Sequence, residues 1–183
     1  MVWACFSGKR IEPILILEQR EIESNEYERI VWGGLLPMVN NLLTPPELGS
    51  NTICVANNSD PLFMHDNALC HKTPNVIKLL EENNIPVMKW PPPSSDLNPI
   101  ENLWRDLKHH FNLKFHELQS GPSTSKEAFE TYSTLIQKCW YKQNQTVIKW
   151  LIESMPRRCK AVIEAKRGHT KYWLVTCNDS YLL

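Results

Sequence analysis

The sequence lacks the features that mark membrane, secreted and fibrous proteins. Its 183 residues contain no apolar run close to the roughly 20 residues that a membrane-spanning helix needs. The opening segment MVWACFSGKR has no basic region followed by an apolar stretch and a cleavage site, so we expect no signal peptide. Internal repeats and low-complexity runs are absent as well. With 42% hydrophobic and 22% charged residues, the composition predicts a folded domain with a packed core.

Closely spaced cysteine pairs are also missing. The 6 cysteines lie far apart without a CxxC pair, so we expect reduced, mostly buried thiols. The dipeptide Cys70-His71 and the histidines His109, His110 and His116 have spacings that fit no common closed zinc site. A zinc site is therefore not expected.

The chain has no excess of one charge, which argues against a strongly basic nucleic-acid-binding domain. Lysine plus arginine number 20, as do aspartate plus glutamate. The two parts of the chain differ, however, because residues 1–100 carry a net charge of −5 and residues 101–183 a net charge of +5. The positive part could face a polyanion, or the split could have no function.

Apolar periodicity predicts an order of strands and helices that is typical of an α/β fold. Segments with β-prone residues predict strands, and apolar residues at helical spacing predict helices. In chain order we expect strands over 1–6 and 13–18, a helix over 24–43 weakened by Gly33-Gly34, a strand over 61–67, a helix that Thr73 caps and that ends near Asn83, a strand over 85–90, a long helix from Pro99, and further helices from 126 to 152.

This order predicts a hairpin followed by parallel strands with helices between them. We expect a single domain with an α/β core over residues 1–118. Residues 119–183 are expected to add a helical segment and a basic tail to the same domain.

Asp66 and Glu101 are the candidate metal-binding acids. In an open α/β sheet, functional groups gather at the carboxyl ends of strands, where Asp66 closes one predicted strand. Glu101 lies in the first turn of the helix after the next strand, and the intervening 34 residues fit a path back to the same sheet edge. Converging carboxylates suit a hard divalent cation, and a pair of such cations supports phosphoryl transfer.

Each acid also has a purely structural interpretation. Asn98 and Glu101 have the form of a capping box, in which both stabilise the start of a helix. Glu101 could also pair with Arg105 one turn later, and Asp66 could cap the turn that follows it. Spacing alone does not decide between these interpretations.

Four segments narrow the choice, because together they resemble the mariner-like DDE transposases, in the branch with 34 residues between the second and third acids. The segments are, in order, MVWACFSGKR, HDNALCH, WPPPSSDLNPIENLWRDLK and SMPRRCKAVIEAKRGHTKY. The resemblance runs from Met1 to about Tyr172. It implies an RNase H-like mixed sheet flanked by helices. The implied activity is the cutting and joining of transposon DNA with Mg²⁺, for which Mn²⁺ can substitute.

The resemblance also assigns roles to single residues. By position, Asp66 is the second catalytic acid and Glu101 the third, and both are implied to bind metal. His65 stands where the family usually has glutamine, and Leu69 stands where it usually has proline. The residues implied to shape the site are Asn67, His71, Asp96 and Asn98.

The family's first catalytic aspartate and its helix-turn-helix DNA-binding region would precede Met1. Asp60 does not replace that aspartate, because it lies about 20 Å from Asp66 along an extended chain at about 3.3 Å per residue. We therefore expect a catalytic core that lacks its first, central strand and is inactive in this form.

A basic segment near the carboxyl end supplies candidate DNA contacts, although a solvated tail would look the same. These candidates are Arg157, Arg158, Lys160, Lys166 and Arg167. The resemblance implies DNA with transposon ends as partner, a homodimer on that DNA, and the nucleus as location. Neither a membrane nor a small-molecule cofactor is implied. The alternative function is a non-catalytic remnant that binds DNA weakly and without sequence specificity.

Overall fold

The computed structural model describes residues 1–8, 11–18, 23–43, 62–66, 68–89, 97–118, 121–122, 125–166, 170 and 172, with only the backbone of 41–43. In chain order the elements are β1 (Val2–Phe6), β2 (Ile11–Ile16), α1 (Ser24–Ile30), the π-helical segment η1 (Val31–Leu35), α2 (Leu36–Leu43), the 3₁₀ turn η2 (Leu69–Lys72), α3 (Pro74–Glu82), α4 (Ile100–Lys114), the 3₁₀ turn η4 (His116–Leu118), α5 (Lys126–Trp140), α6 (Gln145–Glu153) and α7 (Met155–Glu164).

The chain divides into two compact units. The terminal unit comprises Met1–Arg20 and Ser94–Leu183, and the middle unit comprises Glu21–Pro93. This division does not follow the predicted boundary after residue 118, which stays a prediction. No helix in the described residues is both long and apolar enough to cross a membrane.

The terminal unit opens with the predicted hairpin. Strands β1 and β2 pair antiparallel, with Ala4 opposite Ile14 in a register that becomes irregular between Ala4 and Phe6. Ala4 and Ile14 are buried, so this face of the hairpin supplies part of the core. The second strand begins at Ile11 rather than at the predicted Pro13, and Pro13 itself is exposed. Proline donates no backbone hydrogen bond and is tolerated at such an edge position.

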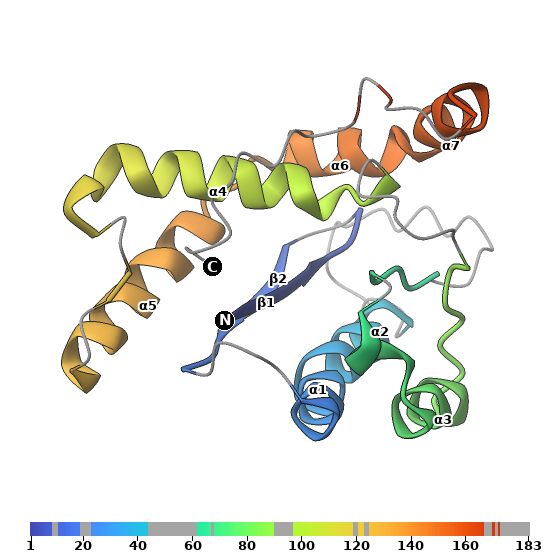
Figure 1. Cartoon of the computed structure of the whole chain (residues 1–183), viewed down its shortest axis with the longest axis horizontal. Helices are drawn as coiled ribbons and strands as arrows, with labels where there is room; N and C mark the ends of the chain where they lie inside the picture. The colour runs from blue at the N-terminus through green and yellow to red at the C-terminus, as the bar shows by residue number, and fades with distance from the viewer. Residues whose placement is uncertain are drawn as a thin grey trace, which may run out of the picture. The chain divides into compact units, whose positions relative to one another are not determined.

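Helices α4, α5 and α6 pack with this hairpin and complete the core of the terminal unit. Figure 1 shows α4 and α6 running side by side with the hairpin below them in that view. The predicted stripe of α4 is confirmed, because Leu103, Leu107 and Phe111 are all buried. Trp140 of α5 is fully buried, and its indole N–H donates to the carbonyl oxygen of Glu12 in β2 at 2.8 Å. Helix α7 lies beyond the last helix that the sequence predicts.

The middle unit contains the predicted helix over 24–43, which forms with one interruption. The chain passes from α1 to α2 through η1, a π-helical turn that contains both Gly33 and Gly34. A π-helical turn inserts an extra residue into the helical ladder. The two glycines therefore alter the helix locally instead of ending it.

Helix α3 begins where the sequence predicts, but its predicted hydroxyl cap does not form. Thr73 occupies the N-cap position, and its carbonyl oxygen accepts from the Ile77 N–H at 3.0 Å. Its hydroxyl oxygen is buried and has no hydrogen-bond partner among the described residues. Helices α1 and α3 are neighbours in this unit, as Figure 1 shows.

The strands predicted over 61–67 and 85–90 are reduced to one parallel bridge in the described residues. Phe63 pairs with Val87, and the Phe63 N–H donates to the carbonyl oxygen of Pro86 at 2.9 Å. The parallel direction is as predicted. Pro86 has no N–H to extend the ladder, which limits the pairing at this point. Residues 61, 67 and 90 of the predicted strands lie outside the described residues.

Candidate active site

Asp66 lies just after the bridge at Phe63, in the middle unit. One carboxylate oxygen, Oδ1, accepts from the Ala68 N–H at 2.9 Å and lies 2.7 Å from Nδ1 of His71. The bond to Ala68 is the predicted turn cap, so the structural interpretation of Asp66 is confirmed. It does not exclude a functional role, because the Asp66 side chain remains 61% exposed.

The surroundings of Asp66 favour its ionised form. The hydrogen bond from His71 lowers the pKa of Asp66 below its usual value, against the opposing effect of partial burial, and the Ala68 N–H adds to the lowering. Asp66 is therefore a carboxylate at neutral pH. An exposed, ionised carboxylate has the chemistry that a hard divalent cation requires of a ligand.

Two further aromatic side chains, Tyr27 and Phe63, contact His71 and its neighbour His65. The Tyr27 ring of α1 packs against His71 in a tilted arrangement with ring centroids 4.0 Å apart, and its hydroxyl lies 3.2 Å from Nδ1 of His65. His65 in turn contacts His71 at 4.9 Å and Phe63 at 5.1 Å. Burial lowers the pKa of His65 to about 4, so this imidazole is neutral at pH 7. Its Nδ1 lies within hydrogen-bond distance of the Tyr27 hydroxyl.

Tyr27 is a candidate site residue that the sequence does not reveal. Its spacing marks it as part of the apolar stripe of the predicted helix over 24–43, and it is indeed 1% exposed. A hydroxyl on an otherwise apolar stripe is the one available signal, and it is weak because buried tyrosines commonly find a polar partner.

Glu101 lies in the first turn of α4, in the terminal unit, and is half-buried. Asn98 is 8% exposed, and its side-chain oxygen accepts from the Ile100 N–H at 3.4 Å. The backbone N–H of Glu101 donates to the carbonyl oxygen of Asn98 at 3.3 Å. Pro99 rather than Asn98 is the N-cap of α4, and the helix has no side-chain cap, so the prediction of Asn98 as N-cap is wrong.

The prediction that Arg158 contacts DNA does not fit the structure. Arg158 is 1% exposed, and its guanidinium donates to Ser154 Oγ and to Asn102 Oδ1, each at 2.8 Å. It also lies 4.8 Å from the centre of the Tyr172 ring. The amphipathic helix α7 directs this arginine into the protein, so its guanidinium bonds other protein groups and does not face solvent.

The other predicted DNA contacts differ in position. Arg157, Lys160 and Lys166 are exposed, and Lys160 forms an ion pair with Glu164 at 3.8 Å. Arg167 lies outside the described residues. Because three exposed basic side chains lie on or just after α7, the prediction of DNA contacts stays open for them.

The structure assigns the two acids to different units, Asp66 to the middle unit and Glu101 to the terminal unit. Their convergence therefore stays a prediction. Asn67 and Asp96, which the resemblance implies to shape the site, lie outside the described residues. Within the part that is described, no group of three His, Cys, Asp or Glu side chains is arranged to hold a metal ion.

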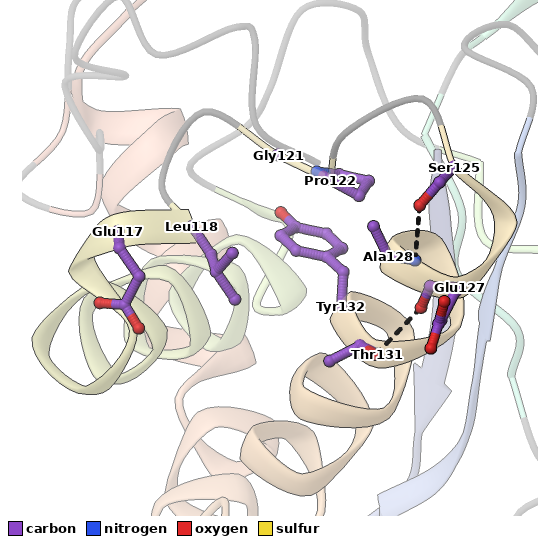
Figure 2. A pocket seen from close by; sticks show the side chains of 9 residues that line it. All are labelled: Glu117, Leu118, Gly121, Pro122, Ser125, Glu127, Ala128, Thr131 and Tyr132. Carbon is purple, nitrogen blue, oxygen red and sulfur yellow. Dashed lines mark hydrogen bonds between the residues drawn. The ribbon is translucent and has the colours of Figure 1, made fainter.

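A pocket of about 530 Å³ lies elsewhere, between η4 and the start of α5. Figure 2 shows the Tyr132 ring at its centre, with Leu118 and Pro122 beside it. Burial raises the pKa of Tyr132. The lining contains none of the residues predicted for catalysis, metal binding or DNA binding.

Comparison with known proteins links the sequence to one group. Residues 50–120 match the family model described as DDE superfamily endonuclease. The Tcb2 transposase of Caenorhabditis briggsae is 31% identical over 172 residues, and the Tc1 transposase of Caenorhabditis elegans is 30% identical over the same length. Each match covers 94% of this chain and 54% of the relative, so the chain spans about half the length of these curated relatives.

Solved structures of a transposase catalytic domain also resemble this chain. The catalytic domain of the Mos1 transposase, in complex with raltegravir and Mn, superposes with a TM-score of 0.64 at 18% identity. The match covers 93% of this chain and 76% of that domain. The corresponding structure with Mg gives the same TM-score of 0.64. At this level of identity, the likeness concerns the fold.

Proposed function

We propose that this chain supplies the second and third acids of a site that cuts and joins transposon DNA. The chain belongs to the DDE transposases of the Tc1/mariner type and has the RNase H-like fold of their catalytic domain. The arrangement of Asp66 carries this proposal. Its carboxylate is ionised and exposed, and one of its oxygens is held by His71 and Ala68. A carboxylate that only capped a turn would not need the additional hydrogen bond from the His71 imidazole.

Asp66 and Glu101 are proposed to hold a divalent cation. The donor set fits, because Mg²⁺ takes carboxylate oxygens together with waters and substrate phosphate oxygens. We propose Mg²⁺, with Mn²⁺ as a substitute, and the Mos1 structures described with Mg and with Mn support this choice. When bound, the cation supplies charge stabilisation in phosphoryl transfer.

The residues of this chain prepare the two ligands. His71 donates a hydrogen bond that keeps Asp66 ionised and oriented. Glu101 lies in the first turn of α4, next to Ile100, whose N–H donates to the Asn98 side chain. The resemblance assigns the first acid to a strand that precedes β1 in the family, and we propose that cleavage requires that acid.

The partners and the location follow from the proposed activity. We propose DNA with transposon ends as the substrate and a homodimer as the form that acts on it. A DNA substrate of this kind places the protein in the nucleus.

A chimera tests the proposed function. The residues of the Tcb2 transposase that precede its match to this chain are joined ahead of Met1, and the product is incubated with DNA that carries the ends of the Tcb2 element. We expect strand cleavage with Mg²⁺ or Mn²⁺ and none after EDTA, because carboxylate ligands act here only through a bound cation. Cleavage that persists in EDTA, or no cleavage by a folded chimera that binds this DNA, would contradict the proposal.

The exposed basic residues around α7 are expected to contribute to DNA binding. Changing Arg157, Lys160 and Lys166 together to glutamine should weaken binding of the full chain to duplex DNA. It should also reduce the slope of log affinity against log salt by about 3, since each lost phosphate contact removes about 0.9. Binding is measured by fluorescence anisotropy at several salt concentrations.

The control removes the same charge from another part of the terminal unit. Lys126, Lys138 and Lys149 are also exposed, and two of them form ion pairs like that of Lys160. Their joint change to glutamine should leave the salt slope nearly intact. Equal weakening by the two triple variants would show that only the net charge matters.

A further inference from the structure

We propose that Tyr27 and His65 are positioning residues for the second acid, because they fix the imidazole ring of His71 that holds the Asp66 carboxylate in one orientation. The inference rests on the proposed function, in which Asp66 is a metal ligand. All four residues belong to the middle unit, so their mutual geometry is described within one compact body.

The first step is the contact between His71 and Asp66. Nδ1 of His71 lies 2.7 Å from the carboxylate oxygen Oδ1 and 3.3 Å from the carbonyl oxygen of Asp66. Both neighbours are acceptors, so Nδ1 carries the proton and donates it. The Ala68 N–H donates to the same Oδ1. Two donors thus occupy Oδ1, and Oδ2 is the oxygen that the carboxylate presents to a cation.

The second step is the restraint on the His71 ring. Tyr27 stacks on it at 4.0 Å with the ring planes tilted by 33°, and His65 stacks on it at 4.9 Å with the planes at 14°. The two neighbours therefore contact the imidazole from different directions. Because the His71 side chain is only 15% exposed, a rotation that moved Nδ1 away from Asp66 would lose both ring contacts.

The third step is the bond that joins the two neighbours. The Tyr27 hydroxyl and Nδ1 of His65 are hydrogen-bonded at 3.2 Å. Tyr27 is fixed by burial in α1, and His65 is two residues from the backbone bridge that Phe63 forms with Val87. The ring cluster is thus attached both to a helix and to the strand segment that leads to Asp66.

This bond also accounts for a departure from the family pattern. His65 stands where glutamine is usual, and a glutamine side-chain oxygen can also accept a hydrogen bond from a tyrosine hydroxyl. The two residue types share an acceptor at this position. We therefore expect His65→Gln to keep the bond to Tyr27 and His65→Leu to lose it.

The test has one measurement that needs no metal. In ¹H–¹⁵N NMR spectra of the full chain, the Nδ1 proton of His71 should give a protected downfield signal because it is shared with a carboxylate. Tyr27→Leu and His65→Leu should increase the exchange rate of this proton at least about tenfold, while His65→Gln should leave it near the original value. Tyr27→Phe retains the ring and loses the hydroxyl, so its effect should be intermediate.

The second measurement is the dissociation constant for Mn²⁺, determined by electron paramagnetic resonance on the same proteins and on Asp66→Asn. Loss of a residue that holds a metal-binding side chain in position typically weakens metal binding about 10- to 100-fold. We expect about tenfold weaker binding for Tyr27→Leu. Trp32→Leu is the control, because Trp32 lies on the same helical run but is 62% exposed. It should change neither readout.

The outcomes separate this inference from the proposed function. If Asp66→Asn weakens Mn²⁺ binding but folded Tyr27→Leu and Tyr27→Phe change neither readout, the positioning role is overturned and the proposed function stands. If Mn²⁺ binds equally to the original chain and to Asp66→Asn, both are overturned. A faster-exchanging His71 proton together with weaker Mn²⁺ binding in Tyr27→Leu, with both readouts near the original values in His65→Gln, supports the role.

Discussion

Asp66→Asn and Glu101→Gln, introduced one at a time into the chimera with the Tcb2 amino-terminal part, are each expected to reduce metal-dependent DNA cleavage about 1000-fold or more. Each substitution keeps the size of the side chain and removes its negative charge. Loss of one carboxylate ligand removes several kcal/mol of transition-state stabilisation, and about 1.4 kcal/mol corresponds to a factor of ten. Cleavage is measured as the rate of strand nicking under single-turnover conditions.

DNA binding by these variants should stay close to that of the unchanged chimera, because neither acid is proposed to contact phosphate directly. The controls are Glu82→Gln in the middle unit and Glu153→Gln in the terminal unit. Both glutamates are exposed and form ion pairs with lysines one helical turn away. Such surface pairs contribute little, so both controls should cleave normally. Undiminished cleavage by Asp66→Asn or Glu101→Gln would remove that residue from the catalytic site.

The sequence predicts the features of this fold that depend on local periodicity. The stripe of Leu103, Leu107 and Phe111 predicts the buried face of α4, because neighbours on one helix face recur every three or four residues. The turn cap that Asp66 provides for Ala68 is likewise local. At two prolines the predicted strands differ from those observed: pairing near Pro86 is reduced to one bridge, and β2 begins at Ile11, before Pro13.

The contacts that support the candidate site join residues far apart in the sequence, so local periodicity does not predict them. Tyr27 and His65 are 38 positions apart, and Asn102 and Arg158 are 56 positions apart. Only the folded chain brings each pair together. In the sequence, Tyr27 therefore looks like an ordinary core residue. The position of Arg158 in a basic segment likewise makes it look like a DNA contact.

Arg158→Met is expected to lower the free energy of unfolding of the full chain by about 3–5 kcal/mol, because two hydrogen bonds from a charged donor are lost and each contributes about 1.5–3 kcal/mol. The guanidinium joins α7 to the first turn of α4, because it bonds Ser154 on one side and Asn102 on the other. Methionine has a similar length but no donor, so the side-chain oxygen of the half-buried Asn102 would lose this partner, at a cost of about 1–3 kcal/mol. Urea unfolding followed by circular dichroism measures the change.

Two further variants distinguish this network from a general effect of charge on α7. Arg158→Lys keeps the charge but lacks the planar fork that reaches both partners, so we expect a smaller loss of about 2 kcal/mol. Arg157→Met removes the same charge from the exposed neighbouring position and should change the unfolding free energy by less than about 0.5 kcal/mol. If Arg158→Met proved as stable as Arg157→Met, the buried network would not exist in solution. Arg158 would then again be a candidate phosphate contact, and its substitution should reduce the salt dependence of DNA binding as that of its exposed neighbours does.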